Sequence, residues 1–190
     1  YKNDNRIKYQ FLNENKGISE NTNEAIKMAK GEYIGFLDHD DLLSQDALFE
    51  VVKAINENKQ VDFIYTDEDK IDENYQRFEP YFKPDFSPDY ITGNNYICHF
   101  SVFKKEVMDK LGGFRDEYNG AQDLDIILRM SEIVEPKDIY HIPKILYHWR
   151  AGENSTANLA EAKPYAYEAG RRAVEAHIGR LGRNGKVENG

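Results

Sequence analysis

The strongest constraint on this chain of 190 residues is a short apolar run that leads directly into polar, mostly acidic residues. Residues 33–37 are continuously apolar, which is typical of a strand buried on both faces of a parallel sheet. Asp38, His39, Asp40 and Asp41 follow at its carboxyl end, where open parallel sheets bind their ligands. Asp38 and Asp40 could share a divalent cation. A solvated turn in which Asp40 or Asp41 caps the next helix fits the same residues, so the motif alone leaves both interpretations open.

The rest of the first half alternates helix and strand patterns. Apolar residues at helical spacing predict helices over 18–29 and from Ser44 onward, the second with Leu48, Val51, Val52 and Ile55 on its inward face. Strands are expected at 8–12 and at 61–65, the latter ending in the acidic residues 66–69, and a proline-rich loop is expected over 72–89. This alternation indicates an α/β fold in which helices flank a mostly parallel, Rossmann-like sheet.

The second half carries weaker signals. We expect a strand within 97–103, a short helix over 104–111 that ends at Gly112-Gly113, a helix over 123–130, a strand over 145–149 and a last helix over 165–181. No shift in composition marks a boundary, so 1–190 is predicted to be a single domain. The polar residues before residue 8 lead us to expect a domain that lacks its N-terminal strands.

Composition excludes some classes of function. The formal net charge of −9 at pH 7 comes without a run of lysine or arginine, so nucleic acid is not expected as a partner. The single cysteine, Cys98, cannot form an internal disulfide, which favours a reducing compartment, the cytoplasm. No apolar run approaches the ~20 residues that span a bilayer, and peripheral association with the inner face of the membrane stays open.

Several segments, in the same order along the chain, carry a resemblance to a known enzyme family. They are residues 15–19 with Asn23, and residues 31–44, 66–70, 82–89, 112–115 and 120–123. Together they resemble the family 2 glycosyltransferases of the GT-A fold, in particular members that build O-antigens, rhamnans and similar polysaccharides. The likeness runs from about Asn13 to Leu181.

The resemblance implies a donor site and a metal site. It places Asp38 near the ribose of a nucleotide-sugar donor and Asp40 on a Mn²⁺ or Mg²⁺ ion that bridges the two phosphates. His148 matches a position that supplies an imidazole to that ion, although a packed or solvent-facing histidine is an equal alternative. The residues that the resemblance assigns to the donor-binding stretch before the strand are Asn15, Gly17 and Asn23.

Asp123 is the candidate for the catalytic base, because it resembles the second acid of a Glu-Asp pair in the family. Gln122 replaces the first acid, which removes a charge that could tune the base. Asp123 would also favour the positive end of its own helix, a role worth ~0.3–1 kcal/mol, and this is the alternative interpretation. We further expect Asp67 and Asp69 to be exposed turn acids, with contact to donor or acceptor as the alternative. Asp125 is expected to lie outside the core, and the remaining histidines are expected to be structural: His99, His141 and His177.

These assignments predict an inverting, metal-dependent transfer of a hexosyl or deoxyhexosyl group from a nucleotide sugar to an acceptor hydroxyl. The acceptor would be a saccharide or a lipid-linked saccharide in the synthesis of cell-surface polysaccharide. Two alternatives stay open. One is a two-carboxylate glycoside hydrolase, which requires neither a metal nor an acid cluster at a strand end. The other is a non-catalytic relic of the fold that binds nucleotide or sugar.

Overall fold

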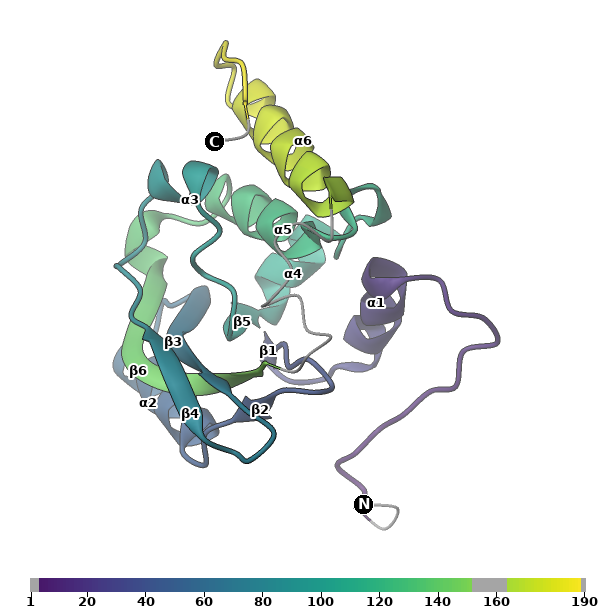
Figure 1. Cartoon of the computed structure of the whole chain (residues 1–190), viewed down its shortest axis with the longest axis vertical. Coiled ribbons are helices and arrows are strands. Elements are labelled where there is room, and N and C mark those ends of the chain that lie inside the picture. Colours follow the sequence, from purple (N-terminus) through teal and green to yellow (C-terminus); the bar gives the residue numbers. More distant parts are fainter. Residues whose placement is uncertain (1–3, 152–163, 189–190) are drawn as a thin grey trace.

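The computed structural model describes residues 4–151 and 164–188 and shows an α/β fold built on one mixed sheet (Figure 1). The strand order is β1 (Tyr33–Gly35), β5 (Ser101–Lys104), β3 (Phe63–Ile71), β6 (Ile139–Arg150) and β2 (Leu42–Leu43), and β4 (Arg77–Tyr81) also pairs with β3. Among the described strands, β3 and β6 are the parallel pair and the other pairings are antiparallel. The α/β class is confirmed, whereas the strand directions differ from a mostly parallel sheet. The reason is that β4 and β5 return along β3 without a full crossover helix, which parallel strands require.

Helices cover both faces of the sheet (Figure 1). On one face lie α4 (Lys105–Leu111) and α5 (Gln122–Ser131), with α6 (Pro164–Arg180) packed against α5, and on the other lies α2 (Ala47–Glu57). Successive residues of β3 pack into the two cores on opposite faces of the sheet, because side chains alternate along a strand. Phe63 and Tyr65 join the core beneath α5, and Ile64 joins the core beneath α2. The other short elements are α1 (Ile18–Met28), α3 (Tyr90–Gly93), η1 (Asp116–Tyr118) and η2 (Pro136–Asp138).

The buried face of α2 differs from the expected one. Ala47, Val51 and Ala54 are buried, whereas Leu48 is 67% exposed and Val52 is 54% exposed. The inward stripe therefore contains small alanines, which allow the helix axis to approach the sheet closely. The amphipathic spacing correctly predicts a helix, but an inward face chosen from the largest apolar side chains is partly wrong.

The strand expected at residues 8–12 is not formed. Tyr9 is 76% exposed and Phe11 is 88% exposed, and their rings contact each other at a centroid distance of 5.5 Å. The segment leaves the body of the fold before α1 (Figure 1). Among the described strands β1 lies at the edge of the sheet and pairs with β5 alone, and residues 8–12 do not pair with its other edge.

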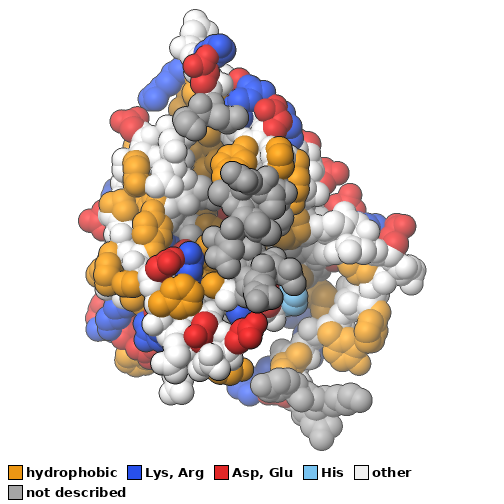
Figure 2. All heavy atoms as spheres, in the orientation of Figure 1, with side chains coloured by type: hydrophobic (Ala, Val, Ile, Leu, Met, Phe, Trp, Pro, Cys, Tyr) orange, Lys and Arg blue, Asp and Glu red, His pale blue; other side chains and the backbone are white. Residues whose placement is uncertain are grey.

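The surface and the helices also bear on the expected partners. Each helix in the described part of the chain is too short or too polar to cross a bilayer. Figure 2 shows lysine and arginine side chains interspersed with aspartate and glutamate on the face in view. That nucleic acid is not a partner stays a prediction, made from the net charge of −9.

Candidate active site

The acidic turn after β1 is held in place by β6. Beyond β1 the Phe36 N–H still donates to the Ser101 carbonyl at 3.2 Å, and the chain then leaves the sheet. Asp41, which is buried, accepts hydrogen bonds from the Tyr147 hydroxyl and from the Arg150 N–H, the latter at 2.8 Å. Burial raises the pKa of Asp41, although both hydrogen bonds oppose the increase. Asp41 is thus an anchor of the turn.

The two acids of the predicted metal motif face solvent from this anchored turn. The side chain of Asp38 is 56% exposed and that of Asp40 is 58% exposed. Arg150 Nε donates to the backbone carbonyl of Asp40 at 2.7 Å and so fixes the main chain. The Asp40 carboxylate itself makes a longer contact, at 3.6 Å, with Nδ1 of the exposed His39 side chain. Both carboxylates are therefore accessible to a ligand.

His99 lies beside Asp38 and joins the acidic turn to the interior. Its Nε2 is 3.7 Å from Asp38 Oδ2, and its ring stacks on Tyr147 at a centroid distance of 4.8 Å. Asp38, Asp41 and His99 each offer one ligand atom, and these atoms all lie within 4.8 Å of one another. Burial alone would lower the pKa of His99, but its hydrogen bond with Glu68 and the surrounding carboxylates raise it. His99 therefore binds a proton more readily than an ordinary histidine does, which suits an anionic ligand.

A buried lysine and Glu68 hold the backbone that carries His99. The Lys83 side chain has no exposed surface, and its Nζ donates to Glu68 Oε2 at 2.9 Å, to the Ile97 carbonyl at 3.0 Å and to the His99 carbonyl. Glu68 Oε2 also accepts the His99 N–H and lies 3.4 Å from His99 Nδ1. Burial would raise the pKa of Glu68, but His99 and the Lys83 charge lower it. Glu68 is consequently a carboxylate that fixes residues 97–99.

His148 lies on β6 next to a second buried acid. Its Nδ1 is 2.5 Å from Asp69 Oδ1, and Asp69 Oδ2 accepts a hydrogen bond from Arg77 Nε at 2.6 Å. His148 is paired across the sheet with Leu42, two residues after Asp40. A carboxylate on one ring nitrogen fixes the orientation of a histidine and leaves the other nitrogen for a metal. A cation shared by Asp40 and His148 stays a prediction.

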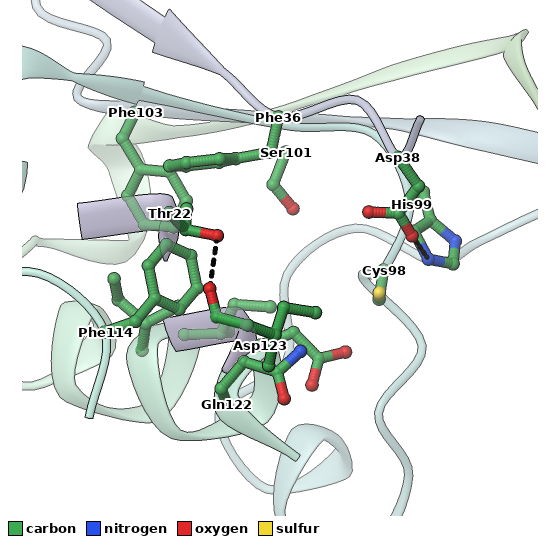
Figure 3. Close-up of a pocket in the computed structure, with 13 residues that line it drawn as sticks. Thr22, Phe36, Asp38, Cys98, His99, Ser101, Phe103, Phe114, Gln122 and Asp123 are labelled. Atoms are coloured by element: carbon green, nitrogen blue, oxygen red, sulfur yellow. Dashed lines mark hydrogen bonds and ion pairs between the residues drawn. The ribbon is translucent and has the colours of Figure 1, made fainter. Parts of the chain in front are cut away.

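Asp123 opens onto the cavity that Asp38 and His99 also line. This cavity of about 140 Å³ lies between the end of β1, the segment before β5 and the first turn of α5. Figure 3 shows Asp38 and His99 together on one wall and Asp123 with Gln122 on another. Asp123 Oδ2 accepts a hydrogen bond from Asn95 Nδ2 at 2.9 Å. The chain therefore brings a strand-end acid and a helix-start acid to one cavity from positions 85 residues apart in the sequence.

Gln122, the departure from the family pattern, has a local role. Its Oε1 accepts the N–H of Gly120 at 2.7 Å, in the turn that leads into α5. Gly120 has a φ of +98°, a conformation that favours glycine. A glutamate could accept the same bond, so the replacement preserves the turn and removes one negative charge beside Asp123.

The three residues assigned to the donor-binding stretch lie just before α1 (Asn15 and Gly17) and within it (Asn23). Asn15 Oδ1 accepts the Gly17 N–H at 3.0 Å, and Gly17 precedes the helix with a φ of +91°. Asn23 donates to the Phe114 carbonyl and accepts the Phe114 N–H, both at 2.8 Å. The Asn23 amide thus links α1 to the loop after α4. Contact of these residues with a nucleotide stays a prediction.

Several polar residues belong to the interior, contrary to expectation. Asp67 is buried and accepts hydrogen bonds from the Lys83 N–H at 2.9 Å and from His141 at 2.8 Å. His177 pairs with Glu132 at 2.6 Å. His141 and His177 are structural, as expected, but Asp67 and Asp69 are not exposed turn acids. The nine-residue strand β3 continues through them, and partners distant in sequence satisfy their charges.

Sequence reasoning missed Asn95, His99, Glu68 and Lys83 as residues of the site. A weak signal was present for His99, because it is a polar residue inside an apolar run before β5. Asn95 stands in a polar pair just before the buried residues Tyr96 and Ile97. Both signals become informative only once the fold places these residues beside Asp38 and Asp123.

Comparison with known proteins connects this geometry to a family. The profile described as glycosyl transferase family 2 matches residues 1–112. Uncharacterized protein y4gI of Sinorhizobium fredii is 48% identical over 177 residues, which are 93% of this chain and 20% of that protein. O-antigen biosynthesis protein RfbC of Myxococcus xanthus is 39% identical over 166 residues, which are 87% of this chain and 13% of that protein. The chain thus spans about a fifth or less of the length of these relatives.

A solved structure shows the same fold. Mannosyltransferase PcManGT from Pyrobaculum calidifontis, in complex with GDP-Man and Mn²⁺, superposes with a TM-score of 0.55. The match covers 93% of this chain and 46% of that one, at 17% sequence identity. At this identity the likeness concerns the fold alone.

Proposed function

Because the chain belongs to glycosyl transferase family 2 and has the GT-A fold, we propose that it is the catalytic domain of an inverting glycosyltransferase. The observation that carries the proposal is the cavity shared by Asp38, at the end of β1, and Asp123, at the start of α5. An accessible acid at a strand end suits a nucleotide-sugar donor, and a second acid across the cavity suits proton removal.

In the proposed reaction Asp123 accepts the proton of an acceptor hydroxyl. The hydroxyl oxygen forms a bond to the anomeric carbon of the donor while the bond from that carbon to the diphosphate breaks, and the nucleoside diphosphate departs. Attack opposite the leaving group inverts the anomeric configuration, so no covalent sugar intermediate with the protein is needed. The Asp123 carboxylate is bound by Asn95 through Oδ2, and its other oxygen is the one that would take the proton.

Asp40 and His148 would hold a divalent cation of the Mn²⁺ or Mg²⁺ type. Asp40 offers an accessible carboxylate, and Asp69 orients His148 so that Nε2 is the ring nitrogen left for a metal. The cluster of Asp38, Asp41 and His99 is a less suitable ligand set, because Asp41 already accepts two hydrogen bonds and the pKa of His99 is raised. A carboxylate and imidazole donor set suits Mn²⁺. When bound, the cation would neutralise the charge of the departing diphosphate.

The substrates and the location are part of the same proposal. A nucleotide sugar would be the donor, with Asp38 beside its ribose. A saccharide or a lipid-linked saccharide would be the acceptor, and the relative named O-antigen biosynthesis protein supports a role in making surface polysaccharide. The single cysteine agrees with a cytoplasmic location, and peripheral association with the membrane would bring the domain to a lipid-linked acceptor.

The test uses the full-length protein and a panel of UDP- and GDP-sugars with and without Mn²⁺. A donor at ~100 times its dissociation constant adds ~2.7 kcal/mol of stability, which thermal unfolding detects. We expect one donor to raise the Tm with Mn²⁺, and Asp40→Asn to abolish the Mn²⁺-dependent part of this increase. Asp123→Asn should lower transfer by ~10²–10⁴-fold while leaving the donor-induced increase unchanged, and Asp116→Asn, an exposed acid of η1, serves as the control.

Other outcomes would assign a different function. Donor binding without transfer to any acceptor would identify a non-catalytic relic of the fold. Near-normal transfer by Asp123→Asn would contradict its role as the base. Transfer that is independent of any divalent cation would contradict the metal assignment.

A further inference from the structure

We propose that Asn95 positions the Asp123 carboxylate with one end of its amide and receives a hydroxyl of the acceptor sugar with the other. The proposal rests on the function proposed above for Asp123. It concerns a residue of the segment between α3 and β5, to which neither the sequence nor the comparisons assign a role. Asn95 would be a positioning residue for the base and a contact for a polyhydroxylated acceptor.

The first observation is the hydrogen bond itself. Asn95 Nδ2 donates to Asp123 Oδ2 at 2.9 Å, between residues 28 positions apart in the sequence. A hydrogen bond to one carboxylate oxygen restricts rotation of the carboxyl group. It also distinguishes the two oxygens, since Oδ2 is occupied and Oδ1 is the oxygen that can take a proton. A base must be oriented to within hydrogen-bond reach of its substrate, so this restriction matters for the rate.

The second observation is the rigid backbone on which Asn95 sits. The next two residues, Tyr96 and Ile97, have no exposed surface. The Tyr96 hydroxyl accepts the Ser87 N–H at 2.8 Å, and its ring stacks on Tyr90 at a centroid distance of 5.0 Å. Asn95 therefore projects from a fixed point of the core, which is the requirement for a residue that orients another.

The third observation is the other end of the amide. Asn95 Oδ1 is buried and has no hydrogen-bond partner among the residues that the structure describes. A buried carbonyl oxygen without a partner costs free energy, so such an atom is expected to meet a donor when the site is filled. The amide nitrogen is committed to Asp123, which leaves Oδ1 as an acceptor for an O–H group.

The fourth observation is the position of the pair between two cavities. Asn95 and Asp123 both line a cavity of about 520 Å³ beside Glu68 and Trp149. Both also line a second cavity, of about 540 Å³, between α3, the start of α5 and α6. Sugars carry hydroxyls on neighbouring carbons. An acceptor that donates one hydroxyl to Asp123 can therefore donate the adjacent hydroxyl to Asn95 Oδ1.

Two substitutions of Asn95 separate the two ends of the amide. Asn95→Asp keeps an acceptor oxygen but loses the donor to Asp123 and adds a like charge, whereas Asn95→Leu removes both groups. Asn58→Asp is the matched control, because Asn58 is also half-buried and donates one side-chain hydrogen bond, at 3.0 Å to the Ala54 carbonyl. The measurements are kcat, the KM of the donor, the KM of p-nitrophenyl hexosides as acceptors, and the Tm of the full-length protein.

We expect Asn95→Asp to lower kcat about 10–100-fold, the scale on which small misplacements affect catalysis, with both KM values near those of the wild type. Asn95→Leu should lower kcat similarly and also raise the acceptor KM about 5–10-fold, as the net loss of one substrate hydrogen bond would. Asn58→Asp should keep kcat within twofold. Because Asn95 acts through Asp123, adding Asn95→Asp to Asp123→Asn should not slow transfer further.

The contrary results are distinct from failure of the proposed function. If Asp123→Asn abolishes transfer but Asn95→Asp keeps kcat within threefold, the positioning role is overturned and the base assignment stands. If the donor KM and the Tm change together with kcat, or if the effects of the double substitution add, Asn95 is merely structural. If Asp123→Asn transfers normally, the base assignment itself fails. An unchanged acceptor KM in Asn95→Leu would overturn the hydroxyl contact.

Discussion

Replacing Asp125 with asparagine tests whether the second acid of α5 stabilises the fold instead of taking part in the chemistry. Contrary to the expectation that it lies outside the core, its side chain has no exposed surface. It accepts hydrogen bonds from Arg115, through Nε at 3.1 Å and through Nη2, and from Arg129 Nε at 2.9 Å. Arg129 also donates to the carbonyls of Leu111 at 2.7 Å and Gly113 at 2.8 Å. One carboxylate thus joins α5 to the end of α4 and to the segment before η1.

The magnitude follows from the burial of these partners. Asparagine keeps the shape of Asp125 but removes the charge, so one neutral oxygen would serve two guanidinium groups. The Arg129 side chain is 10% exposed and that of Arg115 is 31% exposed, so water can compensate only in part. Removing one partner of a buried ion pair costs ~3–5 kcal/mol. For a domain of this size 1 kcal/mol corresponds to ~2–4 °C, and we therefore expect the Tm to fall by roughly 6–20 °C.

Thermal unfolding followed by circular dichroism measures this change. Asp116→Asn, which alters an exposed acid in η1, should melt within about 2 °C of the wild type. Below its lowered Tm the Asp125→Asn variant should transfer sugar at nearly the wild-type rate, the reverse of the pattern expected for Asp123→Asn. Asp125→Asn that melts with the wild type, or that is folded but inactive, would refute the reasoning.

Two further changes test the packing away from the cavity. At Gly113, which has a φ of +87°, an added Cβ would lie 2.4 Å from Asn23 Oδ1, whereas at Gly112, with a φ of +73°, it would meet no atom within 4 Å. Gly112→Ala should therefore lower the unfolding free energy by ~1–2 kcal/mol, from backbone strain alone. Gly113→Ala should lower it by ~1–3 kcal/mol more, because the added Cβ would also displace the Asn23 side chain from its hydrogen bonds. Equal losses for the two variants in urea unfolding would contradict this reasoning. Burial would raise the pKa of Glu132, but its hydrogen bonds with Arg180 and His177 lower it. The ionised Glu132 therefore stabilises the fold at pH values above its unfolded-state pKa. This stabilisation is lost as the pH falls through its folded-state pKa. The Tm difference between the wild type and Glu132→Gln should be largest near neutral pH and should shrink as the pH falls through the folded pKa of Glu132, which lies below its usual value of 4.5. A Tm difference that does not change with pH would contradict the assignment.

The helices could be predicted from sequence because their signals are local. Alanine and valine spacing marks α6, and Gly112, which takes the left-handed conformation after α4, ends that helix where the sequence predicts. A capping glycine acts within one turn of the helix it ends, so no tertiary information is needed. The strand expected at 8–12 does not form. A strand is stabilised by pairing with a neighbouring strand, and local sequence signals do not show whether that pairing occurs.

The buried acids could not be predicted because their partners are distant in sequence. Asp69 looks like a turn residue until β6 brings His148 beside it, 79 positions later. The charge of Glu68 is paired with Lys83, 15 positions later. The charge of Asp125 is paired with Arg115 in addition to Arg129 on its own helix. Composition predicts surface positions for such residues, and that expectation fails wherever a charge is paired in the interior.

The contacts of each acid separate those that hold the fold from those available for chemistry. Asp41 accepts two hydrogen bonds and Asp125 contacts two arginines, so neither can accept a substrate proton without losing structure. Asp38 and Asp40 are more than half exposed, and the hydrogen bond that Asp123 accepts from Asn95 occupies one of its two carboxylate oxygens. In the DHDD turn, the fourth residue therefore holds the loop, while the first and third remain accessible. The same distinction within α5 favours Asp123 over Asp125 as the base, because catalysis requires a carboxylate oxygen that the fold has not already used.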